Sequence, residues 1–428
     1  MKEKVMSFFQ EVISPKLNAF ASNDLVRVIQ AGMTAPMGAM IVGSIFTVLQ
    51  TPPVSSDATG FMGTLLAWSQ ANAGWLKIGY LFTMDAIAIY TVIGIVIAFC
   101  RIKELAPTNM IILSLMSFFI LCCDVVVTDK GLTTVIATFF GAKGLFSAII
   151  VSLVVVYLSI FLRKHGVKIK LPDSVPPIVA EPIENLIINI VVVGVFIGLR
   201  LLLAYYSTSF PTLINSLFQP LLNTSDTLGA VVIYVPILRG LWFFGIHGGN
   251  VTGAIMNPIL TANMMANIEA YSNGEAIPYI FTSSFANALL NVGMLPLVIA
   301  MLIVCRSAQL KSISKIGLIP AIFSIGEPII FGTPIVLNFK LVIPYMSAFL
   351  FDGVAYYLLT DWNLISRTVV NVPFTLPAPI KAFLCTLDMR TVVVWAVLMV
   401  INVLVFIPFL RSYDNDCLAM EQQTDEMR

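Results

Sequence analysis

Residues 316–339, IGLIPAIFSIGEPIIFGTPIVLNF, form the stretch around which the rest of the chain must be arranged. The stretch lies between Lys315 and Lys340 and carries a single charge, Glu327, at its middle. An ionisable group inside an apolar run is costly in hydrocarbon and usually faces a partner or a water-filled cavity. Glu327 is therefore the first candidate for a functional residue.

The same stretch is too interrupted to form one smooth spanning helix. The interrupting residues are Gly317, Pro320, Gly326, Pro328, Gly332 and Pro334. Eleven residues precede Glu327 and twelve follow it. At about 1.5 Å per residue, neither half alone crosses a hydrocarbon core of about 30 Å. The sequence thus predicts a re-entrant hairpin with a carboxylate at its tip.

The composition around this hairpin is that of an all-α polytopic membrane protein. Apolar residues make up 58% of the 428 and charged residues 11%, against about 25% charged in a soluble domain. The net charge of +1 gives no support for nucleic-acid binding. Six cysteines without a CxxC pair and only two histidines argue against a disulfide framework and a metal site, so no metal or cofactor is expected.

About ten transmembrane helices are predicted in addition to the hairpin. Uncharged stretches long enough to cross, or nearly so, are 28–50, 105–123, 144–162, 276–305 and 391–410. Softer candidates, some of which contain a charge, are 75–100, 185–206, 228–246, 250–268 and 340–359. Charged positions interrupt any signal-peptide core in the first 24 residues, so the N-terminus is expected to be retained and amphipathic.

Basic residues give these crossings an orientation, because Lys and Arg favour cytoplasmic loops. The clusters are Lys2/Lys4/Lys16, Arg101/Lys103, Arg163/Lys164/Lys168/Lys170, Arg306/Lys311/Lys315 and Arg411. All five fall on one side if both termini are cytoplasmic and the 316–339 hairpin returns to the face it entered from. The proline-rich segment 371–382, NVPFTLPAPIKA, fits a second re-entrant or extended segment from outside, which would place Arg367, Lys381 and Arg390 toward the exterior.

The character of the chain changes near its middle. Residues 1–209 are smoother and more apolar, and we interpret them as a scaffold with a dimer interface. Residues 210–411 have asparagines inside apolar runs (Asn250, Asn257, Asn287 and Asn291), which need partners or water at membrane depth, so the substrate path is placed there. Residues 412–428 form a polar tail that is expected to be cytoplasmic and mobile.

A second group of candidate residues lies at 241–250, LWFFGIHGGN. His247 stands among glycines that let the backbone bend and approach a ligand. Trp242 offers a face for the C–H surface of a sugar ring, and His247 and Asn250 offer hydrogen bonds. The alternative is that His247 is a satisfied interior group and the glycines serve helix crossing. Glu327 has an alternative of its own, since a carboxylate before Pro328 can cap a half-helix.

Several reaction classes lack support in the sequence. We find no GxxxxGK[ST] phosphate loop, no HExxH or GxSxG motif, and no Cys/His nucleophile arrangement. Energy for transport must then come from an ion gradient or from another protein.

Short motifs along nearly the whole chain resemble a known family. They are GEPIIFGTPIVLN at 326–338, GIHGGNV at 245–251, GAKGLF at 141–146, VPP at 175–177 and IVGSIF at 41–46. They resemble enzyme IIC, the membrane permease subunit of the bacterial phosphotransferase system, in its lactose/cellobiose/diacetylchitobiose branch. The resemblance implies a homodimer in the cell inner membrane that carries a β-linked disaccharide or short oligosaccharide inward. It also implies that the C-terminal half contains two re-entrant hairpins and moves with the sugar in an elevator-like manner.

The resemblance also implies partners and residue roles. A separate cytoplasmic IIB protein with a phosphocysteine, supplied by IIA, would phosphorylate the sugar 6-hydroxyl, so the permease itself holds no phosphoryl donor. Glu327 and His247 would bind hydroxyls, with Glu327 orienting the reacting hydroxyl or taking its proton, and Trp242 would stack on the sugar. Phe374 stands where the family commonly has Trp. Gly326 and Phe339 also depart from the family pattern, which puts the usual sugar in doubt.

Two other readings of the residues stay open. An ion-coupled sugar symporter would use Glu327 as its titrating group. A sensor that has lost transport would keep the fold and the binding site without uptake.

Overall fold

The computed structural model describes residues 11, 14–54, 58–127, 133–167, 169, 183–290, 294–333, 335, 336 and 338–426. The chain divides into two compact units. The N-terminal unit comprises residues 22–223, and the C-terminal unit comprises residues 224–428 together with residues 1–21. This division differs from the predicted one at 209/210, because helix α12 belongs mostly to the N-terminal unit. Residues 1–10, the segment 172–182 and Asn291 lie outside the described residues.

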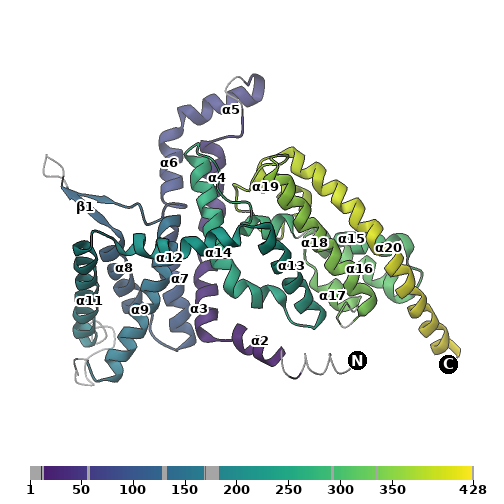
Figure 1. Ribbon diagram of the computed structural model, residues 1–428, viewed down its shortest axis with the longest axis horizontal. Coiled ribbons are helices and arrows are strands. Elements are labelled where there is room, and N and C mark those ends of the chain that lie inside the picture. The colour runs from purple at the N-terminus through teal and green to yellow at the C-terminus, as the bar shows by residue number, and fades with distance from the viewer. Residues whose placement is uncertain are drawn as a thin grey trace. The chain divides into compact units, whose positions relative to one another are not determined.

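The N-terminal unit is built mainly from helices (Figure 1). They are α3 (Asp24–Thr34), α4 (Met37–Gln50), α5 (Gly60–Ala71), α6 (Ala73–Leu81), α7 (Ile87–Ile102), α8 (Thr108–Cys122), the 3₁₀ turn η2 (Ala142–Gly144), α9 (Leu145–Lys164), α11 (Leu186–Tyr205) and α12 (Phe210–Ser225). Its core is formed where α7, α8, α9 and α11 meet, around residues such as Val92, Leu113, Val151 and Val192. Each of these side chains is at most 1% exposed, so this four-helix contact is a dry interior.

Small residues let α3 and α7 approach closely within this unit. A Cβ added at Gly32 would lie 2.0 Å from the Ile95 side chain, and one added at Gly94 would lie 2.4 Å from the Cβ of Ala35. Helices that pack through small residues need no large apolar side chains between them, which is a common solution in membranes.

A two-stranded antiparallel hairpin corrects the prediction of a purely helical protein. Strands β1 (Asp124–Val127) and β2 (Thr133–Ile136) pair with each other, and all their described residues are exposed. Arg200 of α11 anchors the hairpin, because its guanidinium donates to the carbonyls of Ile120 and Cys123 at 2.5 Å and to the Asp124 carboxylate at 3.1 Å. Arg200 is the charged residue within the predicted crossing 185–206. Its guanidinium is thus hydrogen-bonded in the structure.

The C-terminal unit holds a second set of helices, several of them short or interrupted (Figure 1). They are α2 (Ser14–Ala21), α13 (Leu228–Phe243), α14 (Gly248–Ser272), the π-helical turn η3 (Phe285–Leu289), α15 (Leu295–Val304), α16 (Ala308–Ile322), α17 (Glu327–Gly332), α18 (Phe339–Asp361), α19 (Ala378–Thr386) and α20 (Met389–Glu426).

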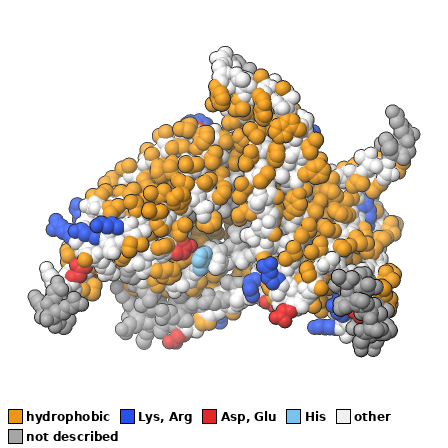
Figure 2. Space-filling view, turned by 180° about the vertical axis from the view of Figure 1, so that it is seen from behind, with side chains coloured by type: hydrophobic (Ala, Val, Ile, Leu, Met, Phe, Trp, Pro, Cys, Tyr) orange, Lys and Arg blue, Asp and Glu red, His pale blue; other side chains and the backbone are white. Residues whose placement is uncertain are grey.

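Five helices among the described residues are long and apolar enough to cross a membrane, or six if α12 and α13 count as one broken span. The five are 24–50, α9, α11, α18 and 389–423. Two predicted crossings are wrong as single helices. Residues 276–305 contain an extended stretch, η3 and α15, and residues 75–100 are divided between α6 and α7. The hydrophobic side chains that cover much of the visible surface in Figure 2 agree with a lipid environment.

Helix α20 shows how the spanning helices separate lipid from protein. Val393, Val397, Val400 and Leu404 recur at helical spacing and are 54–63% exposed, which is the pattern of a lipid-facing stripe. Asn402 points the other way, and its amide donates to both carboxylate oxygens of the buried Asp352 at 2.9 Å. Asp352 therefore has a polar partner inside the unit.

The predicted mobile tail is instead a continuation of α20. The helix runs through residues 412–426, and Asp414 accepts hydrogen bonds from the backbone amides of Arg306 and Ser307 at 2.7 and 3.0 Å. Glu421 accepts from the amides of Ala308 and Gln309 in the same way. These carboxylates satisfy the free amides at the start of α16, which gives the polar segment a reason to stay helical.

Candidate functional site

The interruption predicted within 316–339 is confirmed and has a defined turn. Helix α16 ends in a Schellman motif, in which the amide of Ile325 donates to the carbonyl of Pro320 and the amide of Ser324 to that of Ala321. Ser324 adopts the left-handed conformation, with φ of 62°. Helix α17 then begins at Glu327, with Pro328 in its first turn. Glu327 thus stands at the break between two helices, as the glycines and prolines predicted.

A second broken helix pair carries the other predicted residues. Helix α13 ends in the same motif, with Gly245 at φ of 77° in the left-handed position. Helix α14 starts three residues later and is capped by His247, whose Nδ1 accepts the backbone N–H of Asn250 at 3.1 Å. Gly248 has no room for a side chain, because an added Cβ would lie 2.0 Å from the carbonyl oxygen of Leu238. The glycines of this segment thus let the chain turn tightly beside His247.

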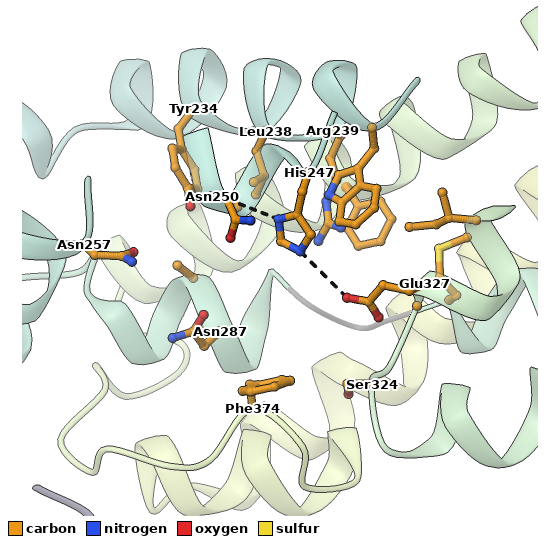
Figure 3. A pocket seen from close by; sticks show the side chains of 17 residues that line it. Tyr234, Leu238, Arg239, His247, Asn250, Asn257, Asn287, Ser324, Glu327 and Phe374 are labelled. Atoms are coloured by element: carbon orange, nitrogen blue, oxygen red, sulfur yellow. Dashed lines mark hydrogen bonds and ion pairs between the residues drawn. The ribbon is translucent and has the colours of Figure 1, made fainter. Parts of the chain in front are cut away.

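The cap determines how His247 meets a ligand. Because Nδ1 accepts a hydrogen bond, the proton of the neutral imidazole is on Nε2. That atom lies 3.9 Å from Glu327 Oε1, and both side chains are close to half exposed (Figure 3). The separation is too long for a direct hydrogen bond. The pair therefore offers one donor and one acceptor to a hydroxyl placed beside both.

Both groups line one pocket within the C-terminal unit, with a volume of about 330 Å³. Its polar lining consists of Tyr234, Arg239, His247, Asn250, Asn257, Asn287, Ser324 and Glu327. Its apolar lining includes Leu238, Trp242, Met294, Ile330, Phe349 and Phe374. Small-molecule sites typically occupy about 300–1,000 Å³ and combine an apolar surface with a few converging polar groups. The polar groups here are neutral donors and acceptors for the most part, which suits an uncharged hydroxylated ligand.

The structure brings all five predicted site residues to this pocket. His247, Asn250, Glu327, Trp242 and Phe374 each line it, although they come from segments as far apart as α13 and the loop before α19. Figure 3 shows Phe374 across the open space from His247. Two of the asparagines singled out in the second half, Asn257 and Asn287, also line this pocket.

The two aromatic candidates lie in different settings. Trp242 is only 6% exposed, and its ring packs against the His247 imidazole at 4.4 Å between centroids. Phe374 is 51% exposed and presents its ring to the pocket. Phe374 therefore offers more open aromatic surface to a ligand, while Trp242 mainly supports His247.

Two cations near the pocket were not among the predicted site residues. Arg239 lines it and lies over the Phe349 ring, with Cζ 3.6 Å from the ring centroid. Lys381 is fully buried, with 0% of its surface exposed. Its Nζ reaches Ser324 Oγ at 2.8 Å and the carbonyl of Asn287 at 3.2 Å. A lysine in an apolar, proline-rich segment was the available signal, but sequence alone does not show which segments surround it.

Three comparisons relate this chain to known proteins. The family model of the phosphotransferase system EIIC matches residues 30–348. The putative permease IIC component YwbA of Bacillus subtilis (strain 168) is 32% identical over 95% of this chain and 94% of its own length. The lactose-specific EIICB component of Lacticaseibacillus casei is 27% identical over 97% of this chain and 72% of its own length. The crystal structure of ChbC, the IIC component of an N,N'-diacetylchitobiose-specific phosphotransferase system, superposes with a TM-score of 0.88, at 26% identity over 97% of this chain and 99% of ChbC.

Proposed function

Because this chain belongs to the EIIC family of the phosphotransferase system, we propose that it imports a β-linked disaccharide or short oligosaccharide of the cellobiose, diacetylchitobiose or lactose type. A separate phosphorylated IIB protein phosphorylates the sugar at its 6-hydroxyl during import. The family members are integral membrane sugar permeases. Beyond family membership, we propose the class of sugar, the IIB partner and the phosphorylation step for this chain.

The observation that carries the proposal is the pairing of His247 Nε2 with Glu327 Oε1 at 3.9 Å, opposite the open ring of Phe374. A hydroxyl beside both groups can accept from the imidazole N–H and donate to the carboxylate. The Phe374 ring can lie against the C–H face of a sugar unit, and Asn250 and Asn287 supply further polar contacts. This combination fits a neutral sugar better than a charged solute.

The same geometry suits phosphoryl transfer to a sugar hydroxyl. The sulfur–phosphorus bond of the phosphocysteine breaks with its electron pair staying on sulfur, the bond from O6 to phosphorus forms, and the O6 proton is released. Phosphoryl transfer depends mainly on positioning and electrostatics. We assign to Glu327 the orientation of O6 through its accepted hydrogen bond, with proton acceptance as the alternative role.

The proposed phosphoryl donor is the phosphocysteine of a IIB protein. Residues 1–428 show no IIB-like phosphocysteine loop, and the chain matches 72% of the length of the lactose-specific EIICB relative. We therefore propose a cytoplasmic IIB partner with IIA upstream, acting on the open side of the pocket.

The two units take different roles in this proposal. The C-terminal unit holds the whole pocket and moves with the sugar in an elevator-like manner, while the N-terminal unit forms the homodimer scaffold in the cell inner membrane. Ile190 and Leu201 of α11 are 63% and 65% exposed, which supports an apolar surface toward lipid or a second copy. The basic clusters support a cytoplasmic location for both termini.

Binding to the purified protein tests the sugar class. Isothermal titration with cellobiose, lactose, diacetylchitobiose and mannobiose should give saturable binding to at least one of them, and maltose, which is α-linked, serves as the comparison. Binding of maltose alone would contradict the proposed β-linked class. An ion-coupled symporter would bind the same sugars, so this measurement tests the sugar class and not the mode of transport.

Replacing Phe374 with Trp is expected to tighten sugar binding about fivefold. The larger ring adds roughly 40 Å² of apolar contact, which corresponds to about 1 kcal/mol at about 25 cal/mol per Å². The matched control is Phe351→Trp, since Phe351 is exposed on α18 and does not line the pocket. Equal affinity of wild type and Phe374→Trp for every sugar bound would show that position 374 lies outside the binding surface.

A further inference from the structure

Lys381 joins three segments that line the pocket but lie far apart in the sequence. Its Nζ donates to Ser324 Oγ at 2.8 Å, to the carbonyl of Asn287 at 3.2 Å and to the carbonyl of Phe374 at 3.4 Å. Asn287, Ser324 and Phe374 all line the pocket, and Figure 3 shows them along one side of it. Lys381 lies directly behind this side, with 0% of its surface exposed.

The setting of Lys381 is unusual for a structural lysine. Burying an ammonium group is costly unless it is paired and hydrogen-bonded. Among the described residues no carboxylate forms an ion pair with Lys381, and its three partners are neutral oxygens. Two of these acceptors are backbone carbonyls. Such carbonyls are accessible because Asn287 lies in the π-helical turn η3 and Phe374 in a loop outside any helix.

Ser324 supplies the side-chain acceptor of this arrangement from the end of α16. It occupies the left-handed position of the Schellman motif at the end of α16, with φ of 62°. Glycine is the usual residue there, and α13 uses Gly245 at the same position of its own motif. A residue with a side chain costs about 1–2 kcal/mol in this conformation. The hydroxyl of Ser324 is the acceptor that lies nearest to Lys381 Nζ, and glycine could not provide it.

We propose that Lys381 is a positioning residue that sets the distance between the Phe374 ring and Glu327. Through Phe374 O it holds the loop that carries the aromatic ring. Through Ser324 Oγ it holds the turn three residues before Glu327. A ligand that must touch both the ring and the carboxylate is then selected by the spacing of these two segments, which makes Lys381 a determinant of sugar length.

This inference rests on the proposed function for its ligand, but part of its test does not. The variants are Lys381→Met, which keeps length and removes the charge, and Ser324→Gly, which removes the acceptor and relaxes the backbone. The controls are Lys315→Met, an exposed lysine of α16, and Asn363→Gly, an exposed left-handed position at φ of 57° away from the pocket.

The first measurement compares affinity for cellobiose with affinity for methyl β-glucoside, a monosaccharide that cannot span both contacts. Lys381→Met and Ser324→Gly should each lower cellobiose affinity about tenfold, the effect of losing one hydrogen bond from a charged donor. They should change methyl β-glucoside affinity less than twofold, and neither control should change the ratio. A merely structural role predicts equal losses for both sugars. An unchanged ratio in Ser324→Gly, which is expected to unfold at the same or a higher temperature than wild type, would overturn the proposal even if Lys381→Met does not fold.

The second measurement needs no sugar. Hydrogen exchange followed by mass spectrometry should show faster exchange in two sets of peptides, those covering 371–377 and those covering 323–327. This is expected for Ser324→Gly and for Lys381→Met relative to wild type. Asn363→Gly should exchange like wild type in both segments. If wild type binds none of the four β-linked disaccharides, the proposed ligand class fails, and the exchange result alone decides whether Lys381 holds the two segments. Unchanged exchange in either segment would overturn the positioning role.

Discussion

Replacing Glu327 with Gln is expected to lower sugar affinity about 30- to 100-fold and to abolish sugar phosphorylation. The variant keeps the size of the side chain, but a neutral amide replaces the negatively charged carboxylate that accepts a hydrogen bond from the sugar hydroxyl. A hydrogen bond to a charged group contributes about 1.5–3 kcal/mol, and about 1.4 kcal/mol corresponds to tenfold in affinity. Isothermal titration of the purified variant measures the loss in binding, and sugar 6-phosphate formation with phosphorylated IIB measures the loss in transfer.

The matched control for this prediction is Glu275→Gln, which makes the same chemical change at an exposed position outside the pocket. Glu275→Gln should bind and transfer like wild type. Glu327→Asp adds a second comparison, because it keeps the charge but withdraws it by one methylene. Wild-type affinity in a folded Glu327→Gln variant would remove this carboxylate from the site and leave it as the residue that starts α17.

Replacing His247 with Asn is expected to lower sugar affinity about tenfold to 30-fold while leaving the fold intact. Asparagine is a preferred N-cap, so its side-chain oxygen can take over the hydrogen bond that Nδ1 accepts from the Asn250 amide. The remaining donor, the NH2 group of the asparagine side chain, lies closer to the backbone than Nε2 and so does not reach toward Glu327 as Nε2–H does. Titration of the variant with the preferred sugar measures the loss, and its unfolding temperature in detergent should match that of wild type.

His247→Ala separates the two functions of this side chain. It removes the cap as well as the donor, so it should lose both affinity and about 0.5–2 kcal/mol of stability. If His247→Asn binds sugar as wild type does while His247→Ala does not, the imidazole acts as a helix cap only. That result would return His247 to the alternative stated for it from sequence, a satisfied interior group.

The local break around Glu327 could be predicted because its causes are local. Gly326 is the N-cap residue of α17 and Pro328 lies in its first turn, so both favour a helix start at this point, whereas Pro320 lies inside α16 and does not end it. The charge in an apolar run identifies the break as polar. The glycines flanking His247 gave the same kind of signal. Both predicted segments do contain helix ends, and their side chains meet in one pocket.

Features that depend on distant contacts could not be predicted. The run 276–305 is uncharged and has the composition of a spanning helix. In the structure, however, Asn263 and Asn267 of α14 bind the backbone around 279–281 and keep that part extended. The position of Lys381 is of the same kind, because the three oxygens around its Nζ come from segments up to 94 residues away.

The extent of α20 also depended on a distant partner. Its last 15 residues are polar and carry several charges, which is typical of a mobile tail. They remain helical in the structure because Asp414 and Glu421 bind the amides at the start of α16. Composition shows the polarity of such a segment but not the helix end that it covers.

The chemical form of the sugar after uptake distinguishes import coupled to phosphorylation by IIB from import coupled to an ion gradient. Right-side-out vesicles, whose lumen is the cytoplasmic side, are loaded with IIB, IIA and the upstream phosphoryl donor. The labelled disaccharide that the purified protein binds is then added outside. If the protein is a phosphotransferase permease, we expect sugar 6-phosphate inside the vesicles. This product should be absent when IIB is omitted, and it should still form when ionophores collapse the proton and sodium gradients. Accumulation of unmodified sugar that needs an ion gradient and no IIB would contradict the proposed function and establish the symporter.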